Sequence, residues 1–325
     1  MPKKANKMPV VDSTYVPPRA FRNPHLQTIL PALFRSVPLL PFKRERLELT
    51  DGDFLDLDWM KTGGRKLAIL THGLEGSTRS KYISALGRHL LARGVNVLAW
   101  NFRGCSGEPN RIPAWYHSGK SEDLRSVIQH VESSENYDDI FLVGFSVGGN
   151  VTLKYLGEGS VSSRIAKAVT ISVPIDLGSA AEVLAWPKNK VYLKWFLSHL
   201  KNKVTAKHPL FPSELVVEGL NTIKNFREFD ARFTAPLNGF LSADEYWTKA
   251  SCKPYLRNIK VPTLLLTARD DPFLSSQCYP EKEAEESDYL TLEITQFGGH
   301  LGFLPKKRGG AYHYESRTLE FLDIK

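Results

Sequence analysis

The stretch from Ile140 to Asn150, Ile-Phe-Leu-Val-Gly-Phe-Ser-Val-Gly-Gly-Asn, constrains the fold more than any other part of the chain. It begins with apolar residues typical of a buried strand, and a helix-compatible segment follows it at once. Between the two, Gly144 and Gly148 stand two residues on either side of Ser146. A turn that leads directly from a strand into a helix is too tight for side chains at those positions. The pattern therefore predicts a strained turn that exposes the Ser146 hydroxyl above a sheet, although five residues alone are a weak signal.

Composition narrows the class of protein without identifying it. The 325 residues are 42% hydrophobic and 24% charged, as in ordinary globular proteins, and Lys plus Arg minus Asp plus Glu is 43 − 35 = +8. No nucleic-acid-binding motif accompanies this mild basic excess, so we expect a solvated surface and no nucleic-acid partner. The three cysteines, Cys105, Cys252 and Cys278, lack C-x-x-C spacing. They indicate neither a metal site nor a disulfide framework, and they favour a reducing compartment.

The amino-terminal segment gives little periodic signal. Residues 1–7 are basic but no apolar run follows them, and no stretch of 18 apolar residues occurs in the sequence. We therefore expect neither secretion nor a membrane span, and a cytoplasmic location. Residues 1–43 are rich in Pro and basic residues and predict an arm that is extended over the body or partly disordered. Within it, residues 21–30 are compatible with one apolar-faced helical turn; packing against the core is favoured, and peripheral membrane contact stays open.

Beyond the arm, strand patterns alternate with helix patterns. A hairpin is expected around the turn Asp51-Gly52-Asp53, because apolar and polar residues alternate on both sides of it. Short apolar runs predict strands at 67–71, 95–100, 140–145, 165–173, 261–267 and 289–295, and helical spacing predicts helices at 82–93, 121–133 and 312–322. Strands that alternate with helices indicate a mainly parallel central sheet flanked by helices.

This rhythm stops between Pro174 and Pro254, after the sixth predicted strand. The segment shows several helical patterns, no convincing strand and many aromatic residues. A helical insertion at this place would overhang Ser146 and supply a lid. Its lysines are expected on the solvated faces of helices: Lys188, Lys190, Lys194, Lys201, Lys203 and Lys207. We thus expect an arm at 1–43 and one catalytic domain at 44–325, with a helical lid at about 174–254.

A serine hydroxyl needs a histidine to accept its proton and a carboxylate to orient that histidine. His300 is the candidate base, because it follows the last predicted strand in the glycine-rich stretch 298–303. The acid is expected at the end of the preceding strand, in Thr-Ala-Arg-Asp-Asp-Pro at 267–272. Asp271 is favoured, because in the usual arrangement of a fold with such a serine turn the carboxylate comes three residues after the small residue that closes the strand. Asp270 stays open as the alternative, with a turn-capping role for whichever of the two is not the acid.

Acyl transfer also requires hydrogen-bond donors for the oxyanion. The backbone N–H of Val147, directly after the candidate nucleophile, is one expected donor. The other is expected from the loop Thr71-His72-Gly73-Leu74-Glu75-Gly76, where Gly73 allows close approach and Leu74 offers its N–H. His72 is expected to order this loop by hydrogen bonding.

Several long motifs in order resemble the YheT-like α/β-hydrolases, bacterial relatives of the lipid-directed ABHD hydrolases. The motifs lie at 23–28, 71–82, 101–110, 116–119, 123–124, 144–150, 229–246 and 298–303, so that the resemblance covers most of the chain. It implies the α/β-hydrolase fold, a triad of Ser146, Asp271 or Asp270, and His300, and carboxylic ester hydrolysis. Some animal relatives are credited with an H-x4-D acyltransferase motif, but five residues separate His117 from Asp123 here. That activity is not carried over, and Arg103, His117 and Asp123 are expected to hold a loop together.

The sequence therefore predicts a cofactor-independent, metal-independent serine esterase that forms an acyl-enzyme on Ser146. The expected partner is a small-molecule or lipid ester with an apolar acyl group. Thioester or phospholipid acyl hydrolysis is an alternative, and a catalytically silent binding protein on the same fold is another. A dehalogenase is disfavoured because it needs a carboxylate nucleophile at the turn. The oligomeric state, the acyl length and the physiological substrate stay open.

Overall fold

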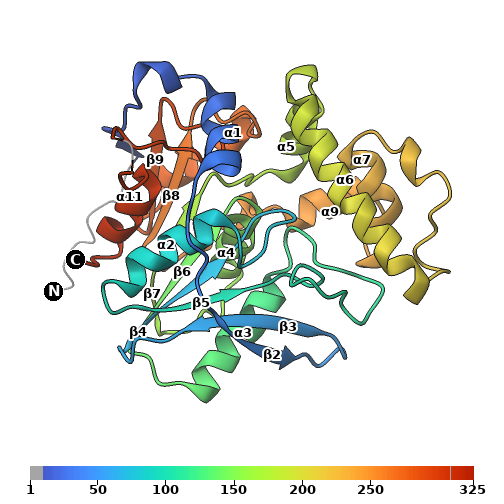
Figure 1. The fold of residues 1–325 in the computed structure, drawn as a ribbon, viewed down its shortest axis with the longest axis horizontal. Helices are drawn as coiled ribbons and strands as arrows, with labels where there is room; N and C mark the ends of the chain where they lie inside the picture. The colour runs from blue at the N-terminus through green and yellow to red at the C-terminus, as the bar shows by residue number, and fades with distance from the viewer. Residues whose placement is uncertain (1–9, 308) are drawn as a thin grey trace.

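The computed structural model describes residues 10–307 and 309–325, and a nine-stranded sheet lies at its centre (Figure 1). The order of the strands is β1-β9-β8-β7-β6-β4-β5-β3-β2. The strands are β1 (Val10–Asp12), β2 (Lys43–Glu48), β3 (Phe54–Met60), β4 (Lys66–Thr71), β5 (Asn96–Trp100), β6 (Asp139–Phe145), β7 (Ile165–Ile171), β8 (Thr263–Ala268) and β9 (Leu290–Thr295). Only the β2–β3 and β3–β5 pairs are antiparallel, which confirms the expected mainly parallel sheet.

Helices cover both faces of this sheet. They are α1 (Pro24–Phe34), α2 (Lys81–Leu91), α3 (Ser121–Ser134), α4 (Val147–Gly157), α5 (Leu177–Leu184), α6 (Lys190–Lys207), α7 (Phe226–Phe229), α8 (Ala235–Leu237), α9 (Ala243–Ala250), α10 (Glu281–Glu285) and α11 (His313–Phe321). A π-helical turn spans Asp230–Thr234, and short 3-10 turns lie at Arg19–Phe21, Pro187–Asn189, His208–Leu210, Leu220–Thr222, Lys253–Asn258 and Ser276–Cys278. No helix within 10–307 and 309–325 is long and apolar enough to cross a membrane.

Strand β6 shows why the apolar runs in the sequence are continuous. Ile140 and Leu142 point into a core shared with α3 and α4, whereas Phe141 and Val143 point into a second core shared with α2 and α11. Successive side chains of a strand face opposite sides, so a strand covered on both faces is apolar throughout. This arrangement carries the end of β6, and Ser146 with it, on a rigid scaffold.

The amino-terminal arm is more structured than the sequence suggested, over the part that the structure describes; its first nine residues lie outside the described ranges. β1 adds a parallel edge strand to β9, with Val10 opposite Leu292. α1 is a helix of 11 residues and not a single turn. Asn23 caps it by accepting backbone hydrogen bonds from His25 and Leu26. A three-residue strand is too short to show a period, and an internal proline concealed the helix, so the prediction of an extended arm was wrong here.

The segment between β7 and β8 is helical and contains α5 to α9, drawn in yellow and orange at the right of Figure 1. We call residues 174–254 the insertion. Of the strands that the sequence predicted, the sixth precedes the insertion. In the structure this strand is β7, because β1, which the sequence did not predict, comes first. Three of its lysines, Lys188, Lys190 and Lys194, are exposed as expected.

For two other lysines of α6, the expected exposure was wrong. Lys207 is only 2% exposed, and the Lys203 side chain only 13%. Buried residues recur along α6 at helical spacing, at Leu193, Leu197, Leu200 and Val204. Lys207 continues this stripe and Lys203 borders it, so helical periodicity could have identified the two as inward-facing.

Candidate active site

Ser146 occupies the sharp turn between β6 and α4. Its φ of +52° is unusual for a residue with a side chain, and its backbone N–H donates to Ile171 O at 2.9 Å. A Cβ on Gly148 would lie 2.4 Å from the carbonyl oxygens of Thr71 and His72. The end of β4 thus packs directly against the first turn of α4. The steric reason predicted for this glycine is confirmed.

His300 lies between Ser146 and Asp271. Its Nε2 is 3.0 Å from Ser146 Oγ, and its Nδ1 is 2.9 Å from Asp271 Oδ2. The Asp271 carboxylate favours a proton on Nδ1, which leaves Nε2 free to accept a hydrogen bond from the serine hydroxyl. The second carboxylate oxygen of Asp271 accepts the backbone N–H of Phe273 at 2.9 Å. The exposed fractions are 9%, 9% and 4% for Ser146, His300 and Asp271, so the three groups lie largely away from water.

Asp270, the alternative candidate, makes no hydrogen bond to the His300 ring among the described residues. Its Oδ1 accepts the backbone N–H of Gly299 at 2.9 Å. Its Oδ2 is buried and has no hydrogen-bond partner among the residues that the structure describes. Burial, aided by the neighbouring Asp271, raises the pKa of the Asp270 carboxyl to about 6. Of the two acidic residues, the structure therefore brings only Asp271 to the histidine ring.

The loop that carries His300 is held by side chains from three separate elements. The successive N–H groups of Gly299, His300 and Leu301 donate to Asp270 Oδ1, Thr28 Oγ1 and Ser172 Oγ, at 2.9, 2.9 and 3.3 Å. Thr28 belongs to α1, and Ser172 follows β7. Neither was among the predicted site residues. The motif at 23–28 was part of the family resemblance, and this was the available signal for Thr28.

The loop after β4 lies directly against the turn that carries Ser146. A Cβ on Gly73 would meet Ser146 Cβ at 3.2 Å, so this glycine permits the close approach. Glu75 adopts a left-handed conformation with φ of +51°, and Gly76 N–H donates to Gly73 O at 3.0 Å. The N–H groups of Leu74 and Val147 donate to no acceptor within the described residues. Two unpaired donors on adjacent segments are what an oxyanion site requires.

His72 is a structural member of this loop. Its Nδ1 bonds Gly73 O at 2.8 Å, and its Nε2 accepts the backbone N–H of Phe102 at 3.1 Å. Burial lowers the pKa of His72 to about 4, so the ring is neutral at pH 7. The prediction that His72 orders the loop by hydrogen bonding is confirmed.

Arg103 and Asp123 form the expected loop-holding pair, but His117 is not part of it. Arg103 Nε and Nη2 donate to the two carboxylate oxygens of Asp123 at 2.8 and 2.7 Å. His117 instead accepts the N–H of Gly119 at 3.2 Å, and its ring packs edge-on against Phe240. Burial lowers the pKa of His117 to about 3, so it does not pair as a cation. The grouping of all three residues was therefore wrong.

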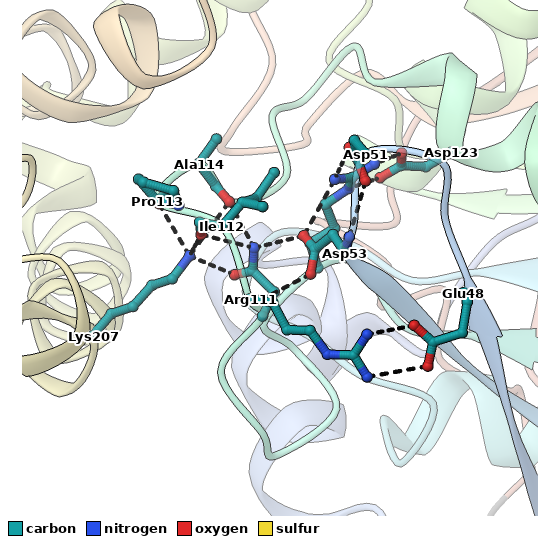
Figure 2. Close-up of polar contacts among 11 residues, drawn as sticks. Glu48, Asp51, Asp53, Arg111, Ile112, Pro113, Ala114, Asp123 and Lys207 are labelled. Carbon is teal, nitrogen blue, oxygen red and sulfur yellow. Dashed lines mark hydrogen bonds and ion pairs between the residues drawn. The ribbon is translucent and has the colours of Figure 1, made fainter.

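A polar network extends from Asp123 and Asp53 to Lys207 of the insertion (Figure 2). Arg103 contacts Asp53, and Asp53 accepts Asn110 Nδ2 at 2.7 Å. Lys207 donates to Asn110 Oδ1 at 2.7 Å. Its ammonium also contacts the carbonyl oxygens of Ile112, Pro113 and Ala114. The carboxyl end of α6 is thus fastened to the loop at 110–114 by one buried ammonium group.

An apolar cavity of about 90 Å³ adjoins the turn that carries Ser146, where Val147 lines it. Leu74 and Val147 lie in its wall on the sheet side, and α5 supplies Ala180 and Leu184 from the insertion. Aromatic side chains, including Trp247, complete the wall. A small apolar space beside two unpaired backbone donors suits the hydrocarbon part of a substrate.

No group of three or more His, Cys, Asp or Glu side chains in the described part of the chain is arranged to hold a metal ion. The polar groups at Ser146 are instead paired with one another, as covalent catalysis by a hydroxyl requires.

Comparisons with known proteins agree with this architecture. A family model described as alpha/beta hydrolase fold matches residues 68–307. YheT of Escherichia coli is 35% identical over 313 residues, which cover 94% of this chain and 90% of that protein. The human phospholipase ABHD3 is 31% identical over 306 residues, which cover 91% of this chain and 75% of the relative.

Solved structures show the same fold at lower identity. The esterase Pf2001 of Pyrococcus furiosus superposes with a TM-score of 0.60 at 21% identity, covering 96% of this chain and 98% of the other. At this identity the likeness concerns the fold alone. It extends over nearly the whole chain.

Proposed function

The chain belongs to the alpha/beta hydrolase fold family and, within it, to the YheT-like proteins, and from this premise we propose that it is a serine hydrolase that cleaves carboxylic esters. The observation that carries the proposal is the continuous contact from Ser146 Oγ through the His300 ring to Asp271, at 3.0 and 2.9 Å. This is the arrangement by which a histidine activates a hydroxyl.

In the proposed mechanism, Ser146 Oγ attacks the ester carbonyl carbon while His300 Nε2 accepts the hydroxyl proton. The carbonyl oxygen becomes an oxyanion and receives hydrogen bonds from the N–H groups of Leu74 and Val147. His300 then gives its proton to the leaving alkoxide, and an acyl group stays on Ser146. Water, activated by the same histidine, attacks the acyl-enzyme and releases the acid. Asp271 keeps the imidazole in the required tautomer.

Asp271 is the proposed acid of this triad, and Asp270 holds the backbone of the histidine loop. The hydrogen bond from Gly299 N–H to Asp270 Oδ1 supports this division, because it engages that carboxyl group with the backbone of the loop. The two neighbouring carboxyl groups would then have separate tasks, one at the imidazole and one at the loop.

The insertion is proposed to act as a lid over an apolar acyl group. The support is the position of Ala180 and Leu184 of α5 in the wall of the cavity that reaches Leu74 and Val147. Phospholipid acyl hydrolysis is the second candidate, favoured by the similarity to a relative named as a phospholipase. We propose 44–325 as the catalytic domain and 1–43 as an amino-terminal arm, whose β1 and α1 pack against that domain.

The test is labelling of the purified protein with a fluorophosphonate probe, followed by mass spectrometry of the modified peptide. We expect modification at Ser146 and none in Ser146→Ala. The substitution should also lower ester turnover by about 10⁴ to 10⁶ if the triad works as a unit. A loss below tenfold would exclude the mechanism. A panel of 4-nitrophenyl esters, thioesters and phospholipids then separates the two candidate activities.

A further inference from the structure

A buried ion pair connects the insertion to the loop that carries Leu74. Lys203 Nζ of α6 donates to Glu75 Oε1 at 2.6 Å. The same oxygen accepts the hydroxyl of Tyr116 at 2.8 Å, and the Tyr116 hydroxyl accepts the backbone N–H of Glu75 at 2.9 Å. Lys203 also lies 3.2 Å from Cys105 Sγ. One carboxylate oxygen of Glu75 thus accepts hydrogen bonds from both Lys203 and Tyr116.

Both charges of this pair are largely removed from water. The exposed fractions of the side chains are 13% for Lys203 and 7% for Glu75. Burial opposes the charge on Lys203, yet the pKa of its ammonium stays above the ordinary value because Cys105 and Glu75 lie beside it. Loss of one partner of a buried pair leaves an uncompensated charge, whereas loss of both is often nearly neutral. Each charge of the pair is therefore stable in this buried position only while the other is present.

The position of Glu75 gives this pair a functional consequence. Glu75 directly follows Leu74, whose N–H is a proposed oxyanion donor, and it holds a left-handed φ of +51°. This backbone conformation costs energy for a residue with a side chain, and it fixes the peptide group between Leu74 and Glu75, next along the chain from the peptide that carries the Leu74 N–H. The contacts to Tyr116 and Lys203 hold the conformation in place. An unpaired Glu75 carboxylate would also oppose negative charge developing nearby.

We propose that Lys203 is a positioning residue for the oxyanion loop, so that the insertion completes the catalytic site in addition to covering it. This inference rests on the proposed function. Lys203 does not touch the reacting atoms; it neutralises Glu75 and keeps the Leu74 N–H aimed at the carbonyl oxygen of the substrate.

The chain allows this role to be separated from mere docking of α6. Lys207 lies one helical turn further along α6 and is held by Asn110 and three backbone carbonyl oxygens. It continues to fasten the helix when Lys203 is changed. Lys201, on the same helix, donates only within the insertion, to Asn221 O and Ile223 O at 3.3 and 2.7 Å. Lys201→Met is therefore a matched control.

The experiment measures kcat and KM on 4-nitrophenyl butyrate and the rate of fluorophosphonate labelling at Ser146. Lys203→Met should lower kcat and the labelling rate by about 10- to 100-fold, a loss about tenfold smaller than that from removal of an oxyanion donor itself. KM should change by less than about threefold, because the ester is still bound. Lys201→Met should stay within about twofold of the unaltered protein in all three quantities.

The double variant Lys203→Met/Glu75→Gln provides the decisive readout. Removal of both charges should raise kcat at least about tenfold above that of Lys203→Met. The reason is that the amide at position 75 still accepts the Tyr116 hydroxyl but carries no charge. Wild-type kcat in Lys203→Met, or no recovery in the double variant, would overturn the inference while Ser146→Ala stays inactive. Ester turnover that survives in Ser146→Ala would overturn the proposed function and this inference together.

Discussion

The backbone N–H of His300 donates to Thr28 Oγ1 at 2.9 Å, although 272 residues separate the two in the chain. The contact joins the amino-terminal helix α1 to the loop that carries the proposed catalytic base. The Thr28 hydroxyl in turn donates to Pro24 O at 2.8 Å, so its oxygen is oriented toward the loop. The helix thereby limits the positions that the imidazole can take.

Thr28→Val should lower kcat by about tenfold, because it leaves the buried His300 N–H without an acceptor at a cost of about 1 to 3 kcal/mol. The side chain keeps its shape, so the fold should be preserved. Thr28→Ser retains the hydroxyl and should restore most of the activity. Steady-state kinetics with thermal unfolding of each variant checks this, and equal activity of the Val and Ser variants would refute it.

Asp271→Asn should lower kcat by about 10⁴, because the amide favours the wrong tautomer of His300; the magnitude is that of the chymotrypsin case. Asp270→Asn should lower it by less than about tenfold, since an amide oxygen can still accept the Gly299 N–H. Both variants are to be compared by kcat at pH 8. A larger loss in Asp270→Asn than in Asp271→Asn would reverse the assignment of the two carboxyl groups.

Gly148→Ala should destabilise the protein by about 3 kcal/mol, because the new methyl group would overlap the carbonyl oxygens of Thr71 and His72. Gly178 is the matched control. It is likewise the second residue of a helix, and a Cβ there meets nothing nearer than Trp247, at an ordinary 3.5 Å. Gly178→Ala should leave the free energy of unfolding unchanged or raise it by up to about 1 kcal/mol. Urea denaturation of the two variants distinguishes them.

The buried carboxyl group of Asp230 should make stability depend on pH. Burial raises its pKa from 3.8 to about 6, while Trp247 Nε1 donates to it at 2.8 Å. A raised pKa means that the folded state favours the protonated form of Asp230. The stability that the protonated carboxyl group contributes is therefore complete below pH 3.8 and is lost as pH rises through about 6. Asp230→Asn retains an acceptor without the charge.

The free energy of unfolding of Asp230→Asn should therefore exceed that of the unaltered protein by a margin that grows between pH 4 and 6. The margin should reach about 3 kcal/mol and stay constant above pH 7, from a shift of about two pH units. Urea titrations at half-unit intervals measure it. A margin independent of pH would contradict the raised pKa.

Ala180→Leu should narrow the range of acyl chains that the protein accepts, because the larger side chain enters the cavity wall. The ratio of kcat/KM for hexanoyl to acetyl esters should fall by about tenfold, as expected for loss of one or two methylene sites in an apolar pocket. Ala185, exposed at the end of the same helix, provides the control variant Ala185→Leu. Equal ratios in the two variants would place the acyl group elsewhere.

Local patterns were sufficient for much of this protein. Continuous apolar runs predicted the central parallel strands, because a strand covered on both faces must be apolar throughout. The glycines around Ser146 predicted the sharp turn, because a strand that leads directly into a helix leaves no room for side chains at those positions. The placement of His300 after the last strand followed from the order of strands in the family. These features depend on residues that are neighbours in the chain, or on an order of strands that recurs throughout the family.

Only the tertiary structure decided which groups meet across long separations. Asp270 and Asp271 are adjacent and chemically equal in the sequence, and the path of the β8 turn directs just one of them to His300. Lys203 was assigned to a solvated face by its charge, yet it is buried against Glu75 because two charges can leave water as a pair. Residue type predicts the cost of burial, whereas the fold determines whether a partner is present to offset it.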